Sequence, residues 1–132
     1  MQKIIIASGP VIVEKNNVLL DQHGDDRFWK FCGGKTKENE SLIETALQRA
    51  KEELSIEIEI IDEKPFILHT KKKTPEGIID IILVHFLSKR IGEIVPGKEI
   101  LKWKWLPIEE LEQQDLAPNI LPTLRHFGFT QN

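Results

Sequence analysis

Two adjacent carboxylates, Glu52 and Glu53, follow two adjacent glycines, Gly33 and Gly34, at a distance of one loop and one helix. Glycines let the backbone turn sharply and approach a ligand closely, because no side chain intervenes. Carboxylate oxygens suit Mg²⁺ or Mn²⁺, which often keep waters and take further ligands from a substrate phosphate. The pattern therefore predicts a divalent cation site that faces a bound phosphate.

The two glutamates fall in a predicted helix, Ser41 to Leu54. Apolar residues recur at helical spacing along one side of it: Leu42, Ile43, Ala46, Leu47, Ala50 and Leu54. The preceding segment, Gly34 to Glu40, is predicted as a loop. We expect the helix to present Glu52 and Glu53 into a cleft, with the apolar stripe on the opposite side.

The segment from Gly34 to Ile56 resembles the Nudix box, written G-x5-E-x7-R-E-U-x-E-E-x-G-U with U a bulky aliphatic residue. In this register the chain keeps Gly34, Glu40, Glu52, Glu53 and Ile56. It departs at Gln48 for arginine, Arg49 for the first glutamate, Ala50 for the aliphatic residue and Ser55 for glycine. The chain thus resembles the Nudix hydrolase superfamily, in particular its MutT-like branch, with a degenerate box.

The order of elements predicts an α+β domain with a mixed sheet. Strands are expected at Ile4–Ile6, Val11–Val13, Val18–Leu20, Ser55–Ile61, Phe66–Thr70, Ile78–Leu87 and Ile100–Leu106, and later helices at Pro107–Leu111 and Pro118–Phe127. Gly9-Pro10 is expected to separate the first two strands, and the polar stretch Asp21 to Arg27 to form a loop. The resemblance implies the Nudix fold, a mixed β-sheet sandwiched between α-helices, as a single domain over residues 1–132.

The resemblance implies that Glu52, Glu53 and the backbone carbonyl of Gly33 bind Mg²⁺ or Mn²⁺. It also implies that Glu52 and Glu53 are catalytic residues that act together with this ion. Two readings of Arg49 are open, since a family member has a third carboxylate there. Arg49 could pair with Glu52 or Glu53 at helical spacing. Alternatively, it could clamp a substrate phosphate bidentately and so belong to the catalytic site.

Glu40 is a structural position of the box, as is Gly34. In the family this glutamate helps to brace the loop through an arginine, which is Gln48 here. Gln48 can still form hydrogen bonds, without the assistance of a charge.

Three residues outside the box are further candidates: Glu99 and Asn119 through the same resemblance, and Phe28 through its place before the glycines. Glu99 stands where a glutamate often orients or deprotonates water, and its alternative is a surface residue in a turn. Asn119 matches an asparagine that contacts a purine base in MutT-like members, and its alternative is to cap the final helix. Phe28 could stack on a base, although core packing is the commoner use of an aromatic residue.

The resemblance implies a metal-dependent pyrophosphohydrolase acting on a nucleoside diphosphate linked to another group. A nucleoside triphosphate, including one with an oxidised purine, is the first substrate class to test. Because Arg49 replaces a box glutamate, two alternatives stand beside it. One is a catalytically impaired module that binds a nucleotide or a protein, and the other is a domain retained for assembly.

The composition limits the partners. A net charge of −3 over 132 residues gives no support for wrapping nucleic acid, and the run Lys71-Lys72-Lys73 is expected to be a solvated loop that could also steer phosphates.

A single cysteine, Cys32, excludes an internal disulfide framework, and the four histidines show no ligand spacing. The short apolar N-terminal stretch predicts neither a secretory leader nor a spanning helix, so we expect a cytoplasmic location without membrane contact, as a monomer or a homodimer.

Overall fold

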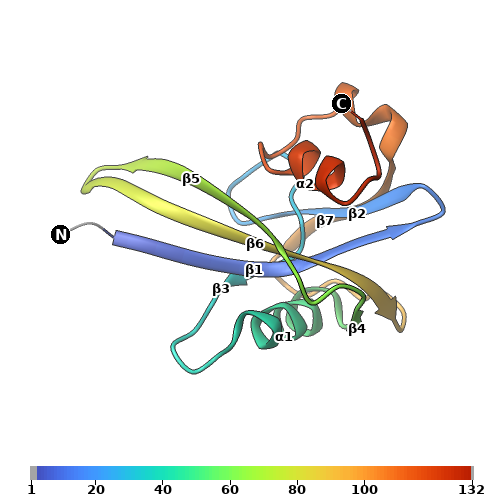
Figure 1. The fold of residues 1–132 in the computed structure, drawn as a ribbon, viewed down its shortest axis with the longest axis horizontal. Helices are drawn as coiled ribbons and strands as arrows, with labels where there is room; N and C mark the ends of the chain where they lie inside the picture. The colour runs from blue at the N-terminus through green and yellow to red at the C-terminus, as the bar shows by residue number, and fades with distance from the viewer. Residues whose placement is uncertain (1–2, 132) are drawn as a thin grey trace.

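The computed structural model describes residues 3–131 of the chain as a twisted sheet with helical elements on two sides (Figure 1). The strands are β1 (Lys3–Glu14), β2 (Asn17–His23), β3 (Gly34–Lys35), β4 (Glu57–Ile60), β5 (Phe66–Thr74), β6 (Gly77–Ile91) and β7 (Ile100–Pro107). The helices are α1 (Leu42–Leu54) and α2 (Ile120–His126), with a 3₁₀ helix η1 (Ile108–Gln113) between β7 and α2. Neither α-helix in the described part has the length and apolar character needed to cross a lipid bilayer.

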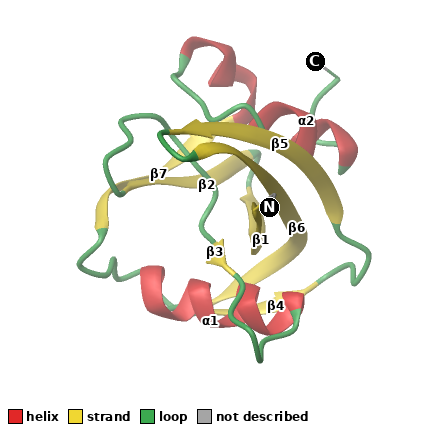
Figure 2. Cartoon of the chain, turned by 90° about the vertical axis from the view of Figure 1, so that its left-hand side faces the viewer, coloured by secondary structure: helices red, strands yellow, loops and turns green. Residues whose placement is uncertain are grey.

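The sheet is mixed, as expected. Its main path runs β4-β6-β1-β2-β7, with β5 paired to β6 and β3 paired to β1. β1 and β6 pair in parallel, from Lys3 opposite Ile79 to Ile12 opposite Ser88, whereas the other strand pairs are antiparallel. Figure 2 shows the short strand β3 between the long strands and α1, where it carries the chain from the sheet towards the helix.

Alternating side chains on the central strands serve two separate cores. Val11 and Leu20 belong to a core shared with η1 and α2, and their neighbours Ile12 and Leu19 belong to a core shared with α1. Successive strand residues point to opposite faces, so each face carries its own apolar set. This arrangement confirms the predicted α+β fold with a sheet between helices.

β1 is continuous through Gly9-Pro10, which corrects the prediction of two separate strands. Pairing with β3 ends at Ser8 and pairing with β2 begins at Val13, so Pro10 lies where β1 is paired with β6 only. A strand tolerates a residue without an N–H group where one edge has no partner.

The basic run Lys71–Lys73 lies within β5, which corrects the expected loop. Its residues pair with Ile78, Ile79 and Asp80 of β6 across a hairpin. The cross-strand partner sets the backbone conformation here, and composition alone does not reveal such a partner.

Local signals explain where α1 begins and ends. Ser41 and Glu44 form a reciprocal capping box at its start, and Ser55 closes it in the left-handed conformation with φ 61°. The side chain of Ser55 also donates a hydrogen bond to the Val95 carbonyl at 2.8 Å. The buried side of α1 includes Arg49, whereas Leu47, which was placed on the apolar stripe, is exposed.

Candidate functional site

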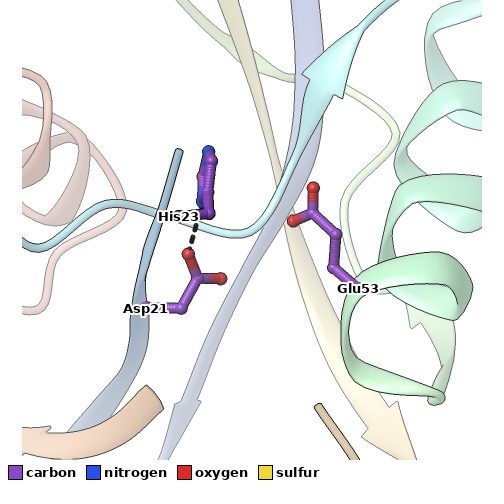
Figure 3. A group of neighbouring side chains, drawn as sticks. All are labelled: Asp21, His23 and Glu53. Carbon is purple, nitrogen blue, oxygen red and sulfur yellow. Dashed lines mark hydrogen bonds and ion pairs between the residues drawn. The ribbon is translucent and has the colours of Figure 1, made fainter. Parts of the chain in front are cut away.

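Three side chains that can bind a metal meet where β2 ends beside the last turn of α1 (Figure 3). They are Asp21, His23 and Glu53, and one ligand atom from each lies within 4.8 Å of the others. Nδ1 of His23 is 2.6 Å from Oδ1 of Asp21. Asp21 is 1% exposed and its Oδ2 atom has no hydrogen-bond partner. Figure 3 shows this second oxygen turned to the side on which Glu53 lies.

Gly33 fixes the position of Glu53. Its backbone N–H donates to Oε1 of Glu53 at 3.2 Å. Gly33 has φ 147°, and a Cβ atom there would lie 2.8 Å from the Ser8 carbonyl oxygen. On the facing strand, a Cβ atom on Gly9 would lie 2.0 Å from the Cys32 carbonyl oxygen. Glycines are therefore required on both sides of this contact, which packs the Gly33 backbone directly against β1.

The environment of the cluster shifts the pKa values of its members. Burial raises the pKa of Glu53, Asp21 raises it further, and His23 opposes the shift. The hydrogen bond to Asp21 raises the pKa of His23 against the effect of burial. Both shifts favour keeping a proton among the three side chains, because two carboxylates close together repel each other. Burial also raises the pKa of Cys32 well above its usual value, so this thiol packs as a neutral side chain.

Arg49 forms ion pairs with glutamates, which is the first of the two readings of this residue. Its Nη2 is 3.1 Å from Oε2 of Glu40, and its Nε is 3.3 Å from Oε1 of Glu52 without the alignment of a hydrogen bond. The residue is 8% exposed, and its Cδ lies 3.1 Å from the place of a Cβ on Gly34. Arg49 thus ties the helix to the loop before it.

Glu40 is held by three donors. Oε1 accepts from the backbone N–H of Lys37 at 3.0 Å and from Oγ1 of Thr45 at 3.1 Å, and Arg49 reaches the other oxygen. These contacts, the Lys37 bond first, hold the pKa of Glu40 below its usual value. The brace of the loop therefore comes from Arg49, which corrects the expectation placed on Gln48.

The structure does not bring Glu52 and Glu53 together. The side chain of Glu52 is 45% exposed, and it accepts a hydrogen bond from Gln48 at 3.0 Å in addition to its contact with Arg49. Glu53 turns the other way, towards Gly33 and His23. The expected cleft with both carboxylates is wrong in this respect, because consecutive helix residues point about a quarter-turn apart.

A cavity of about 600 Å³ adjoins the cluster, within the range of about 300–1,000 Å³ usual for ligand pockets. His23, Gly33 and Gly34 belong to its wall. The wall combines aromatic and aliphatic side chains with a few polar groups, among them Phe28, Phe31, Leu83, Pro118, Lys71, Lys72 and Asn119. The mixture suits a ligand with a flat apolar part and a negatively charged part.

Asn119 reaches across the cavity wall to His85. Nδ1 of His85 is 3.0 Å from the Phe66 carbonyl oxygen, which can only accept, so Nδ1 carries the hydrogen. Burial lowers the pKa of His85, which keeps the ring neutral and leaves Nε2 as an acceptor. Nδ2 of Asn119 therefore donates to Nε2 at 2.9 Å. Asn119 stands at the N-cap position of α2, as the capping alternative expects, but its side chain makes no capping hydrogen bond.

The other two candidates differ in their placement. Phe28 lies in the cavity wall, with Nζ of Lys30 5.4 Å from its ring centre. Glu99 is exposed in the turn before β7 and is absent from the described residues that line the cavity.

Asp21 and His23 were missed from the sequence, where Asp21 to Arg27 was expected to be a loop. β2 continues to His23, and the backbone of Asp21 pairs with Lys30 through two hydrogen bonds of 2.8 and 2.9 Å. The available signal was the Asp-x-His spacing directly after the apolar run Val18–Leu20, which places polar groups at the end of a buried strand.

Comparisons with known proteins agree with this architecture. The family model of the NUDIX domain matches residues 4–127. Nudix hydrolase 5 of Arabidopsis thaliana is 31% identical over an alignment of 116 residues, and the match covers 83% of this chain and 38% of the plant protein's length.

Solved structures share the fold. The solution structure of the E. coli ORF135 protein is 26% identical with a TM-score of 0.71, covering 96% of this chain and 89% of that one. A NUDIX hydrolase from Nitrosomonas europaea reaches a TM-score of 0.80 at 16% identity, covering 95% of this chain and 88% of that one. A MutT NUDIX hydrolase from Burkholderia pseudomallei reaches 0.76 at 18% identity, covering 94% and 98%. With its mixed sheet, its glycine loop and a family match across nearly its whole length, the chain belongs to the NUDIX domain family.

Proposed function

We propose that this chain hydrolyses the pyrophosphate linkage of a nucleoside diphosphate derivative or a nucleoside triphosphate. The reaction breaks one P–O bond of the pyrophosphate and adds the elements of water across it. The observation that carries the proposal is the cavity of about 600 Å³, whose wall joins apolar side chains to lysines and to His23, one of the three side chains in the cluster with Asp21 and Glu53.

The wall offers separate partners for the parts of a nucleotide. Phe28 supplies an aromatic surface for a base, and Asn119 offers an amide that can read a base edge. Because Nδ2 of Asn119 donates to His85, its Oδ1 is held in one orientation as an acceptor. Lys71 and Lys72 supply positive charge for the phosphates. An oxidised purine nucleoside triphosphate fits this division and belongs in the first panel.

Members of the NUDIX family generally use a divalent cation, and the residues present fit one. The fit rests on Oδ2 of Asp21, a buried oxygen without a partner, which lies beside Glu53 and His23. We propose Mg²⁺ or Mn²⁺, with Glu53 and the Gly33 carbonyl as ligands. When bound, such an ion neutralises phosphate charge and polarises the phosphoryl oxygens.

The protein's own groups orient the site. The N–H of Gly33 holds the Glu53 carboxylate, and the pair of Arg49 with Glu40 holds the loop that follows the glycines. Glu52 is engaged by Arg49 and Gln48, so Glu53 is the box carboxylate that this geometry offers to a cation. Glu99 remains a candidate for the general base, and the assay described below tests it.

One observation favours the alternative of a binding module without turnover. Arg49 stands at a box position for glutamate and its charge is committed to Glu40 and Glu52. In that case the cavity binds the nucleotide and releases it unchanged.

The test is a panel of nucleoside triphosphates, oxidised purine triphosphates and nucleoside diphosphate derivatives, with chromatographic detection of monophosphates, pyrophosphate and phosphate. We expect turnover with Mg²⁺ or Mn²⁺ and its loss in Glu53→Gln, while Glu59→Gln, on the exposed side of β4, keeps it. Glu99→Gln tests the proposed base in the same assay. Nucleotide binding without any product would favour the binding module over hydrolysis. Absence of both nucleotide binding and product would refute the proposal.

A cytoplasmic location and a single domain over residues 1–132 are part of the proposal. The match to residues 4–127 supports the domain, and the buried free thiol of Cys32 is compatible with a reducing compartment.

A further inference from the structure

We infer that Asp21, His23 and Glu53 form one binding site for a divalent cation, which binds Zn²⁺ more tightly than Mn²⁺ and Mn²⁺ more tightly than Mg²⁺. The site differs from the set of box carboxylates, because two of its three ligands come from β2. The inference rests on the proposed function for the use of the ion, whereas binding of the ion can be measured without any substrate.

The first observation is the state of Asp21. The residue is 1% exposed, Oδ1 is occupied by His23, and Oδ2 has no partner. A buried carboxylate oxygen without a hydrogen-bond partner costs free energy. Native structures supply such a partner unless the site serves another purpose. Figure 3 shows Oδ2 facing the space between β2 and Glu53. A cation in that space would supply the missing partner.

The second observation is the balance of charge around this space. Two carboxylates meet there, and the neighbouring lysine is engaged elsewhere: Nζ of Lys30 lies 2.5 Å from Oδ2 of Asp26 and 3.3 Å from the His23 carbonyl oxygen. Cys32 contributes a buried neutral thiol. A divalent cation would balance both carboxylates at once, which His23 alone does not achieve.

The ligand set selects the type of ion. Mg²⁺ prefers oxygen ligands only, whereas imidazole together with carboxylates suits zinc, iron, manganese and similar ions. Two carboxylates and one histidine leave further coordination positions open. His23 and Gly33 also line the cavity, which gives an ion a path to the site from solvent.

The decisive experiment is calorimetric titration of the chelator-treated chain with Zn²⁺, Mn²⁺ and Mg²⁺, each as the chloride, without nucleotide. We expect one ion per chain. Asp21→Asn should weaken Zn²⁺ binding by about 10–100-fold, and His23→Gln should weaken Zn²⁺ more than Mg²⁺. Asp25→Asn, in the exposed turn after β2, and Glu52→Gln should leave Zn²⁺ affinity unchanged. Circular dichroism establishes that each variant is folded.

The outcomes separate this inference from the proposed function. Absence of Zn²⁺ binding at millimolar concentration would overturn the inference, as would binding that depends on Glu52 and not on Asp21 and His23. Zn²⁺ binding with the expected dependence but no hydrolysis of any nucleotide would uphold the site and refute hydrolysis. Hydrolysis that persists in Asp21→Asn and His23→Gln, together with unchanged Zn²⁺ affinity in both variants, would uphold the function and refute the site.

Discussion

Arg49 in the helix and Glu40 in the preceding loop are joined by an ion pair with Nη2 and Oε2 3.1 Å apart. The two side chains are only 10% and 19% exposed, so the contact is more protected than a surface ion pair. Arg49 therefore fastens the loop that follows β3. It forms this ion pair at the position where the Nudix box has a glutamate.

A double-mutant cycle measures this contact. Arg49→Gln, Glu40→Gln and the double variant should show a measurable coupling free energy in urea unfolding, because the pair is partly shielded from solvent. Arg49→Gln combined with Glu59→Gln, a distant exposed residue, should be additive and serves as the control. Additivity in the first cycle would mean that the contact contributes nothing.

Replacing Arg49 by glutamate should destabilise the fold and not restore a cation site. The new carboxylate would stand beside Glu40 and Glu52 at a position that is 8% exposed. Breaking a shielded pair and adding a like charge should cost about 3 kcal/mol. Urea unfolding and Mg²⁺ titration of Arg49→Glu provide the measurement. A variant with unchanged stability and tighter Mg²⁺ binding would contradict the role of Arg49 in fastening the loop.

Asp21→Asn should stabilise the metal-free chain while it weakens metal binding. The amide keeps an acceptor for His23, removes a charge beside Glu53 and supplies an N–H that Glu53 can accept. The expected gain is about 1 kcal/mol in the free energy of unfolding, measured with chelator present. Asp25→Asn is the exposed control. A loss of stability in Asp21→Asn would show that the charge of Asp21 is already well satisfied.

Gly33→Ala and Gly24→Ala separate a crowded site from an open one. Both glycines have positive φ, but a Cβ on Gly33 meets the Ser8 carbonyl oxygen at 2.8 Å, whereas a Cβ on Gly24 meets nothing within 4 Å. We expect a cost of about 1 kcal/mol for Gly24→Ala and clearly more for Gly33→Ala, which also moves the N–H that holds Glu53. Thermal unfolding compares the two, and equal costs would contradict the close backbone contact.

His85 should make the stability depend on pH on the acidic side. Burial lowers its pKa in the folded chain, while the unfolded chain takes up the proton near pH 6.5. The unfolded state then binds more protons, so stability falls as the pH drops below about 6.5, by up to about 1.4 kcal/mol per pH unit for one group.

His85→Gln is the matched variant, since glutamine can keep a donor for Phe66 and an acceptor for Asn119. The difference in unfolding free energy between the two proteins should shrink or reverse in favour of the variant as the pH is lowered. A difference independent of pH between 5 and 7 would contradict a buried neutral ring.

The sequence predicted the fold well where local signals and the family pattern agree. The apolar spacing and Ser41 located α1, whereas Gly34 and Lys35, which are predicted to begin a loop, form the short strand β3. The register of the box did not predict which side chain braces the loop. Arg49 forms the ion pair with Glu40, whereas the register places the bracing residue at Gln48. Neighbouring letters in a motif cannot show which of two adjacent side chains turns to the loop.

The metal ligands from β2 could not be predicted for a different reason. Asp21 and Glu53 are 32 residues apart in the chain, and only the pairing of β2 in the sheet brings them together. A buried aspartate at the end of a strand looks like the start of a polar loop until its burial is known. The cavity wall likewise combines β5, β6 and the segment before α2, whose proximity follows from the tertiary fold alone.

The position of a bound ion tests the central claim most directly. Crystals of the chain grown with Mn²⁺ should be measured at an X-ray energy where manganese scatters anomalously. The account predicts a single anomalous peak between Asp21, His23 and Glu53, within about 2.0–2.4 Å of the ligand atoms. A peak between Glu52 and Glu53 on the outer side of α1, or no peak with Mn²⁺ in excess, would contradict it.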